Sequence, residues 1–296
     1  MRTYFLNILF IASLICGSAF AQTPAIVRWK KAVVKIEAVQ QRYSPEQIDG
    51  FLKKKLDSIG HTISQHETAD IRGEISGIKD TLRGTGLMIA DGTKWYLVTA
   101  KHIIKATELS NGAETITDQL FIRSAATDKK TNEIPLLSLT SGLTKYKPFV
   151  LSSDKEDLVI ISFQKSDYKA NVTYMKQIGV VPIPVQDIAS AEDSGNVFTI
   201  GFPALAGSTK AEVSNGKITS NFIAEIAVYP GNTGGPVIKN NKLVGILSYQ
   251  AGVVTNIDAA MHPFAKANSA TVVKASFILP FLRKLQANEA NPTFNR

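Results

Sequence analysis

Residues 231–237 read Gly-Asn-Thr-Gly-Gly-Pro-Val. Three glycines within five residues permit a backbone turn that residues with a Cβ could not follow. Pro236 and Val237 then lead into an apolar segment, so the stretch predicts a tight turn that enters a β-strand. Taken alone, the pattern also fits a simple hairpin or a β-bulge. Segments elsewhere in the chain are needed to distinguish these interpretations.

A histidine stands directly after a predicted strand. Residues 98–102 read Val-Thr-Ala-Lys-His, and the apolar segment before His102 follows an Asp-Gly hairpin turn at residues 91–92. The other three histidines lie in a predicted helical insertion or in a late loop and are expected to be surface or structural residues: His61, His66 and His262.

An aspartate opens another buried strand. Residues 157–161 read Asp-Leu-Val-Ile-Ile, an apolar run that predicts a strand with Asp157 at its start. Asp154 and Glu156 share the same acidic loop, but neither of them directly precedes the apolar run. Asp157 is therefore the preferred candidate, against the alternative that it is a solvated carboxylate at a strand start.

Together the three segments resemble those of trypsin-like (chymotrypsin-fold) serine endopeptidases, whose pattern is T-A-x-H, then D before an apolar strand, then G-N/D-S-G-G-P. His102, Asp157 and Thr233 follow the His, Asp, Ser order of that family. In texture the chain is most similar to bacterial high-temperature-requirement proteases, here without a PDZ domain. The resemblance covers about residues 30–285.

The resemblance implies a catalytic triad of His102, Asp157 and Thr233, with an oxyanion hole formed by Gly231 and Thr233. In such a site the histidine accepts the proton of the nucleophile, and the aspartate orients the imidazole and stabilises its charged form. Glycines around the nucleophile allow two backbone N–H groups to point at the developing oxyanion.

The chain departs from the family at the nucleophile, because Thr233 stands where the family has serine. Threonine keeps the hydroxyl but adds a methyl group on Cβ, which restricts χ1 and crowds a tight turn. Two functions therefore remain open. The first is a peptidase that uses a Thr/His/Asp triad; the second is a catalytically impaired relative that binds peptides or proteins.

The resemblance also implies the residues that contact substrate. Ala227 and Val228 are expected near the floor of the primary specificity pocket, with Ser248, Tyr249 and Gln250 along its wall. None of these side chains is acidic. The hypothesis is a preference for small or medium apolar side chains.

The implied fold is all-β, with two six-stranded antiparallel barrels at about residues 30–165 and 175–275 and a helix near the C-terminus, the whole peptidase domain spanning residues 22–290. A helical insertion interrupts the first barrel at about residues 44–79. Ser44 and Gln47 are expected to form a capping box at its start. Its apolar residues recur at helical spacing and are expected to pack on the first barrel: Ile48, Phe51, Leu52 and Leu56.

Residues 1–21 have the features of a secretory signal peptide: Arg2, an apolar run from Tyr4 to Ile15, and small residues before Gln22. The apolar run is too short to span a bilayer. We expect export to a periplasm or the medium, a mature chain that begins at Gln22, and no membrane span after cleavage. The single cysteine, Cys16, lies in this segment, so no disulfide is expected.

Composition excludes several other classes of function. The net charge is +8, but no basic run is interleaved with aromatic residues, so a nucleic-acid partner is not expected. Neither metal-ligand spacing nor a phosphate-binding glycine loop is found, so no cofactor or metal is expected. The expected partner is a polypeptide, and the sequence leaves the oligomeric state open.

Overall fold

The computed structural model describes residues 24–41, 43, 45–59, 64–107, 114–116, 119–126, 134–138, 150–152, 155–164, 169–189, 194–204, 210–248 and 268–290. The expected signal peptide lies outside these ranges, as do Ser44, His61, Asp154 and His262. Within the described residues, no helix is long and apolar enough to cross a membrane.

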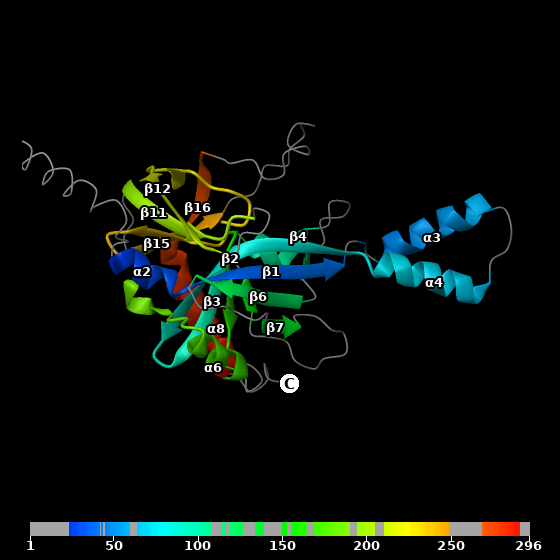
Figure 1. The fold of residues 1–296 in the computed structure, drawn as a ribbon, viewed down its shortest axis with the longest axis horizontal. Helices are drawn as coiled ribbons and strands as arrows, with labels where there is room; N and C mark the ends of the chain where they lie inside the picture. The colour runs from blue at the N-terminus through cyan, green and yellow to red at the C-terminus, as the bar shows by residue number, and fades with distance from the viewer. Residues whose placement is uncertain are drawn as a thin grey trace, which may run out of the picture.

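The N-terminal half is built around an antiparallel sheet (Figure 1). Its strands run in the order β7-β6-β1-β2-β3-β9-β8, and β10 adds to β2 in parallel through Ile183 opposite Ile89. A separate hairpin, β4-β5, follows a short helix, α5. The bounds of these strands are β1 Val33–Gln41, β2 Lys79–Asp91, β3 Lys94–Thr99, β4 Lys105–Thr107, β5 Glu114–Ile116, β6 Gln119–Ala125, β7 Ile134–Ser138, β8 Val150–Ser152, β9 Val159–Ser162 and β10 Ile183–Pro184.

The C-terminal half is a closed barrel of six strands in the order β11-β12-β13-β16-β15-β14. This closed barrel beside a second antiparallel sheet agrees with the expected all-β fold. The first half differs from the expected six-stranded barrel, because in its described residues the path from β7 to β8 stays open and β10 extends the sheet to eight strands. The barrel strands are β11 Gly195–Gly201, β12 Glu212–Ile218, β13 Ile223–Ile226, β14 Pro236–Lys239, β15 Lys242–Ser248 and β16 Ala270–Lys274.

Helical elements precede, interrupt and follow the strands of the two halves. The expected C-terminal helix is present as α8, and Leu282 and Leu285 on it are buried. The helical elements are α2 Pro24–Lys30, α3 Pro45–Ile59, α4 Gln65–Ser76, α5 Lys101–Ile104, α6 Lys169–Gln177 and α8 Ile278–Ala290, with 3-10 turns η2 Val185–Asp187 and η3 Ala275–Phe277.

Two hairpin turns use left-handed residues, and the first of them is the predicted Asp-Gly turn. Gly92 takes a φ of +59° between β2 and β3, a left-handed conformation that costs glycine little. Asn240 and Asn241 both have positive φ, at 48° and 59°, between β14 and β15. Two successive positive φ values describe a type I′ turn, which suits the twist of a β-hairpin and favours Asn.

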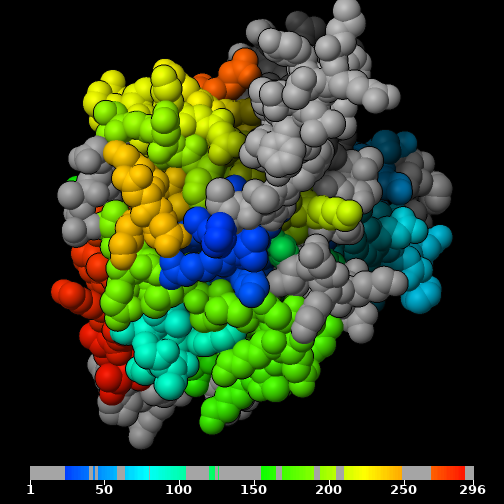
Figure 2. Space-filling model, turned by 60° about the vertical axis from the view of Figure 1, so that its left-hand side comes forward, coloured from blue at the N-terminus to red at the C-terminus, as the bar shows by residue number. Residues whose placement is uncertain are grey.

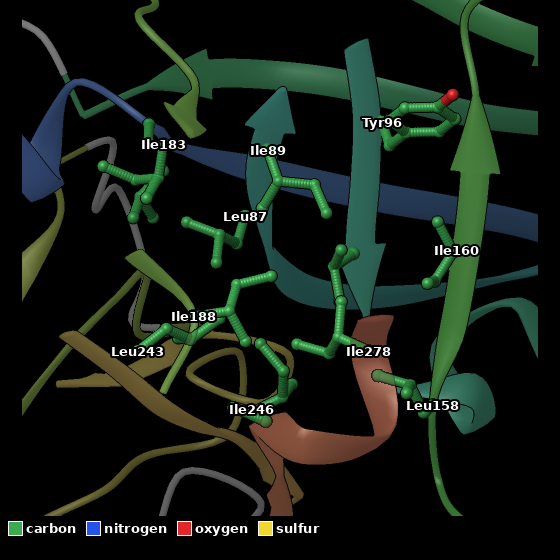
Figure 3. Close-up of a cluster of buried hydrophobic side chains, with 14 of the residues drawn as sticks. Leu87, Ile89, Tyr96, Leu158, Ile160, Ile183, Ile188, Leu243, Ile246 and Ile278 are labelled. Atoms are coloured by element: carbon green, nitrogen blue, oxygen red, sulfur yellow. The ribbon is translucent and has the colours of Figure 1, made fainter. Parts of the chain in front are cut away.

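A large apolar cluster joins the two halves (Figure 3). Leu87, Ile89 and Tyr96 of the sheet meet Ile246 of the barrel and Ile278 of α8, and each of these side chains is fully buried. Each half also has its own core, around Met88 in the sheet and around Val237 in the barrel. Burial of the shared cluster therefore holds the halves together by the hydrophobic effect.

The first described helix, α2, bridges the same boundary. Figure 2 shows these blue residues on the surface where the yellow barrel residues meet the green and cyan residues of the sheet. Trp29 is fully buried and donates its indole N–H to Asn241 at 2.8 Å, while Arg28 pairs with Asp187, which also accepts from Lys242.

The predicted helical insertion is present, but its packing differs from the expectation. Helices α3 and α4 form a hairpin that stands away from both halves (Figure 1). Ile48 and Leu52 are buried, whereas Phe51 is 43% exposed. α3 packs on α4, and an ion pair of 2.5 Å joins Asp49 to Arg72.

The strands that carry the insertion explain why its helices do not pack on the sheet. β1 and β2 stay paired as far as Gln41 opposite Lys79, and this extension carries the helices beyond the sheet.

The capping box that the structure describes belongs to α4, where Ser64 Oγ accepts from the Glu67 N–H at 3.2 Å and Glu67 accepts from the Ser64 N–H at 2.8 Å.

The hairpin is expected to open independently of the two halves. Gly50 and Gly73 lie within α3 and α4, and a Cβ at either position would meet no atom within 4 Å. Alanine stabilises a helix interior by about 1 kcal/mol relative to glycine. The variant Gly50→Ala/Gly73→Ala should therefore slow amide hydrogen exchange across residues 45–76 on the order of tenfold, without raising the Tm of the whole protein.

Gly216→Ala is the matched control, because a Cβ there would lie 2.2 Å from the Glu225 carbonyl oxygen and should lower the Tm instead. A rise in global Tm of several degrees in the double variant, with unchanged exchange in the hairpin, would contradict the separate hairpin.

Candidate active site

His102 is presented by a one-turn helix at the end of β3. Ile103 and Ile104, the next two residues of α5, are buried and anchor the turn in the core of the N-terminal sheet. Gly84 on β2 makes room for this anchor, since a Cβ on Gly84 would lie 2.2 Å from Ile103 Cδ1. The imidazole itself remains 29% exposed, so it can contact another molecule.

Asp157 holds His102 at two points. Its Oδ2 lies 2.7 Å from His102 Nδ1, and its Oδ1 accepts the His102 backbone N–H at 2.9 Å. Burial alone would raise the pKa of Asp157, but hydrogen bonds from His102 and the imidazolium charge outweigh burial and lower the pKa below its ordinary value. An ionised carboxylate can only accept, so the Nδ1 of His102 carries a proton, and in the neutral imidazole Nε2 is the acceptor.

Ser248, expected along the pocket wall, makes a direct contact with Asp157. It ends β15 in the barrel half, is 8% exposed, and donates its hydroxyl to Asp157 Oδ2 at 2.5 Å. This bond also lowers the pKa of Asp157. The carboxylate of Asp157, which precedes a strand of the N-terminal sheet, is thus held in part by a residue of the barrel.

The glycine-rich turn lies against both halves. Gly231 has a φ of +94°, and a Cβ there would lie 2.4 Å from the Phe202 carbonyl oxygen, so only glycine fits. The Pro230 carbonyl accepts the Ala204 N–H at 2.7 Å. Because C=O and N–H point in opposite directions across a trans peptide, this bond turns the Gly231 N–H away from Ala204.

The Thr233 amide, two residues further along the turn, is oriented by an equivalent bond. The Asn232 carbonyl accepts the Gly235 N–H at 3.0 Å, so the Thr233 N–H points to the opposite side. Gly234 has a φ of +85°, and a Cβ there would lie 2.2 Å from Thr99 Oγ1. The turn that carries Thr233 therefore lies directly against the residues that precede His102.

Thr233 itself is 3% exposed. Among the predicted site residues, Asp157 is hydrogen-bonded to both His102 and Ser248. The backbone of the turn that carries Thr233 lies beside them. The described histidine outside this site, His66, is exposed on α4.

The residues expected at the substrate pocket are only partly described. Val228 is fully buried in the barrel core, so its side chain does not face a solvent-filled pocket, whereas Ala227 is half-buried. Tyr249 and Gln250 lie outside the described residues. Sequence reasoning also missed Thr85, a buried hydroxyl between two strand glycines that contacts the turn; that local pattern was the available signal.

Replacing Asp157 with Asn tests the charge in this site. A carboxyl whose pKa is lowered by folding stabilises the folded state above its unfolded pKa, and this contribution is lost as the pH falls through the folded pKa. Asp157→Asn should therefore lower the Tm at pH 7 by roughly 2–6 °C, and the difference from wild type should shrink below about pH 4.

Thermal unfolding between pH 3 and pH 7 measures this difference, and Asp57→Asn on the exposed face of α3 is the control. A difference that widens in acid would show that the carboxylate destabilises the fold.

Comparison with known proteins agrees with this geometry. The sequence profile of the trypsin-like peptidase domain matches residues 84–246, more than half of the chain. No curated protein sequence matches the chain significantly. Among solved structures, the protease Anisep from Arthrobacter nicotinovorans is similar over 87% of this chain and 96% of its own, with 11% identity and a TM-score of 0.50.

Two further solved structures are similar at lower scores. The thermostable serine protease AL20 from an extremophilic microorganism covers 90% of this chain and 100% of its own, with 11% identity and a TM-score of 0.48. Deg5 covers 88% and 91%, with 14% identity and a TM-score of 0.44. The profile match extends across the histidine, the aspartate and the glycine-rich turn, and it shows that the chain belongs to the trypsin-like peptidase family.

Proposed function

We propose that this chain is an endopeptidase that hydrolyses polypeptides with Thr233 as nucleophile, His102 as general base and Asp157 as the residue that orients the base. The observation that supports the proposal most is the two-point contact between Asp157 and His102. A merely structural histidine needs one hydrogen-bond partner, whereas a general base needs a fixed tautomer with a free acceptor nitrogen.

The proposed reaction begins when Nε2 of His102 takes the hydroxyl proton of Thr233 and Thr233 Oγ1 attacks the scissile carbonyl carbon. The resulting oxyanion is stabilised by the N–H groups of Gly231 and Thr233. Collapse breaks the C–N bond, and His102 gives its proton to the departing amine. Water, deprotonated by His102, then hydrolyses the acyl ester and restores the Thr233 hydroxyl, while Asp157 stays ionised throughout.

A binding module that lacks efficient catalysis is the second candidate, and the environment of Thr233 favours it. The side chain is β-branched and 3% exposed in a turn bounded by two left-handed glycines. Its extra methyl group occupies space near the base, the substrate or the oxyanion donors. Attack requires reacting atoms about 3–3.5 Å apart and aligned, so a small displacement would greatly reduce the rate.

Substitution of Thr233 separates the two candidates. Thr233→Ser removes one methyl group and keeps the hydroxyl, and should raise hydrolysis of an unfolded protein such as casein at least tenfold over wild type. Thr233→Ala and His102→Ala should both abolish hydrolysis, because nucleophile and base act as a unit. Equal inactivity of the serine and alanine variants would favour the binding module, and equal activity of wild type and Thr233→Ser would make the methyl group harmless.

We also propose that the protein is exported and that Gln22 is its first residue after signal cleavage. The support is the short apolar run and the small residues Ala19 and Ala21 before the cleavage site. Mass spectrometry of the protein expressed in a bacterium should find the terminus at Gln22, and Ala21→Phe should block cleavage. A terminus beyond about residue 30, together with activity that depends on it, would instead indicate a second processing step.

A further inference from the structure

Thr85 lies where β2 passes the glycine-rich turn. It is fully buried and stands between Gly84 and Gly86. A Cβ on Gly84 would lie 3.2 Å from the Thr233 carbonyl oxygen, and one on Gly235 would lie 3.4 Å from Thr85 Cγ2. The strand and the turn are thus in backbone-to-backbone contact, and Thr85 is the side chain at that contact.

The direction of each hydrogen bond to the Thr85 hydroxyl is determined by its partners. The Phe202 N–H can only donate, and it lies 2.9 Å from Thr85 Oγ1. The hydroxyl proton is therefore left for the Gly231 carbonyl, an acceptor 2.7 Å away. One hydroxyl thus joins β2 to the end of β11 and to the start of the turn.

These bonds hold the peptide group between Gly231 and Asn232. It directly precedes the peptide group that carries the Thr233 N–H. The Gly231 carbonyl belongs to the peptide whose N–H, on Asn232, donates to the Tyr229 carbonyl at 3.0 Å. With Thr85 on its other side, this peptide plane is held at both ends.

The peptide that follows is held in the same way. Thr85 donates its backbone N–H to the Thr233 carbonyl at 2.7 Å, and the N–H of that peptide, on Gly234, donates to the Leu247 carbonyl at 2.7 Å. The peptide group between Asn232 and Thr233, which carries the Thr233 N–H, therefore lies between two peptide groups that accept hydrogen bonds from Thr85.

Thr85 also connects the turn to the histidine. Its carbonyl oxygen accepts the hydroxyl of Thr99 at 2.8 Å, and Thr99 ends the strand that leads to His102. A displacement of Thr85 would therefore shift both the glycine-rich turn and the end of β3, which leads to His102.

We propose that Thr85 is a positioning residue, whose hydroxyl orients the amide donors at Gly231 and Thr233 relative to His102. The expected effect on kcat rests on the proposed peptidase function, whereas the expected effect on the conformation of the turn does not. Valine has nearly the same shape as threonine, so packing alone does not require the hydroxyl. With valine at this position, the Gly231 carbonyl and the Phe202 N–H would lose a buried partner.

The test compares Thr85→Val with Thr85→Ser, each in the wild-type chain and in the Thr233→Ser variant. Thr85→Val should lower kcat for fluorescein-labelled casein by about 10- to 100-fold, part of the loss seen when an oxyanion donor is removed, and change KM less than about threefold. It should also speed amide exchange across residues 229–235 on the order of tenfold. Thr85→Ser, which keeps the hydroxyl, should recover most of both losses.

Thr199→Val is the matched control. Thr199 is 1% exposed on the neighbouring strand β11, and its Oγ1 has no hydrogen-bond partner among the described residues. The same substitution there removes a buried hydroxyl without removing a hydrogen bond. It should leave kcat and exchange in the turn unchanged. Thr85→Ala replaces Thr85→Val if the valine variant does not fold.

Three results would overturn the proposal: a Thr85→Val variant with wild-type exchange in the turn, a Thr85→Ser variant as impaired as Thr85→Val, or an equal loss in Thr199→Val. If neither background cleaves casein, the proposed peptidase function fails and exchange alone decides on Thr85. Faster exchange in Thr85→Val that Thr85→Ser restores would then still establish Thr85 as the residue that orients the turn.

Discussion

The apolar cluster between the two halves is the interaction on which the rest of the structure depends. His102 and Asp157 belong to the N-terminal sheet, whereas Thr233 and Ser248 belong to the barrel. The hydrogen bond from Ser248 to Asp157 crosses between the halves and could not form unless they were closely docked. Burial of large side chains such as Leu87 and Ile246 supplies that docking, and the polar contacts then select the register.

Charge in the site follows from this docking. Asp157 is mostly buried, which by itself disfavours its ionised form, yet donors from both halves hold it ionised. A carboxylate held in this way keeps the adjacent imidazole in one tautomer and one orientation. Separation of the halves would remove the Ser248 donor and expose the carboxylate to water, so the electrostatics of the site depend on the intact interface.

Those parts of the site that depend on local sequence could be predicted. The strand before His102, the strand after Asp157 and the glycine-rich turn each carry their own periodicity or backbone requirement. The hydrogen bonds of the Thr85 and Ser248 hydroxyls could not be predicted, because their partners lie more than 90 residues away in the chain. A buried hydroxyl in an apolar strand indicates that it has a partner but does not identify it.

The same distinction explains the helical insertion. Periodicity predicted the helices, but it could not tell which surface would cover their apolar face, since a stripe fits a sheet or another helix equally well. The length of the β1–β2 pairing decided the outcome, and that length follows from tertiary structure.

The way the insertion joins the protein has a consequence for how the chain can diverge. Residues 42–78 leave and re-enter at Gln41 and Lys79, which are paired neighbours on adjacent strands. A segment joined through one such pair can lengthen, shorten or be exchanged for an unrelated module while both strands keep their register. Selection can therefore act on the hairpin and on the site separately. New binding properties can arise at the end of the paired β1 and β2 strands while the candidate site keeps its geometry.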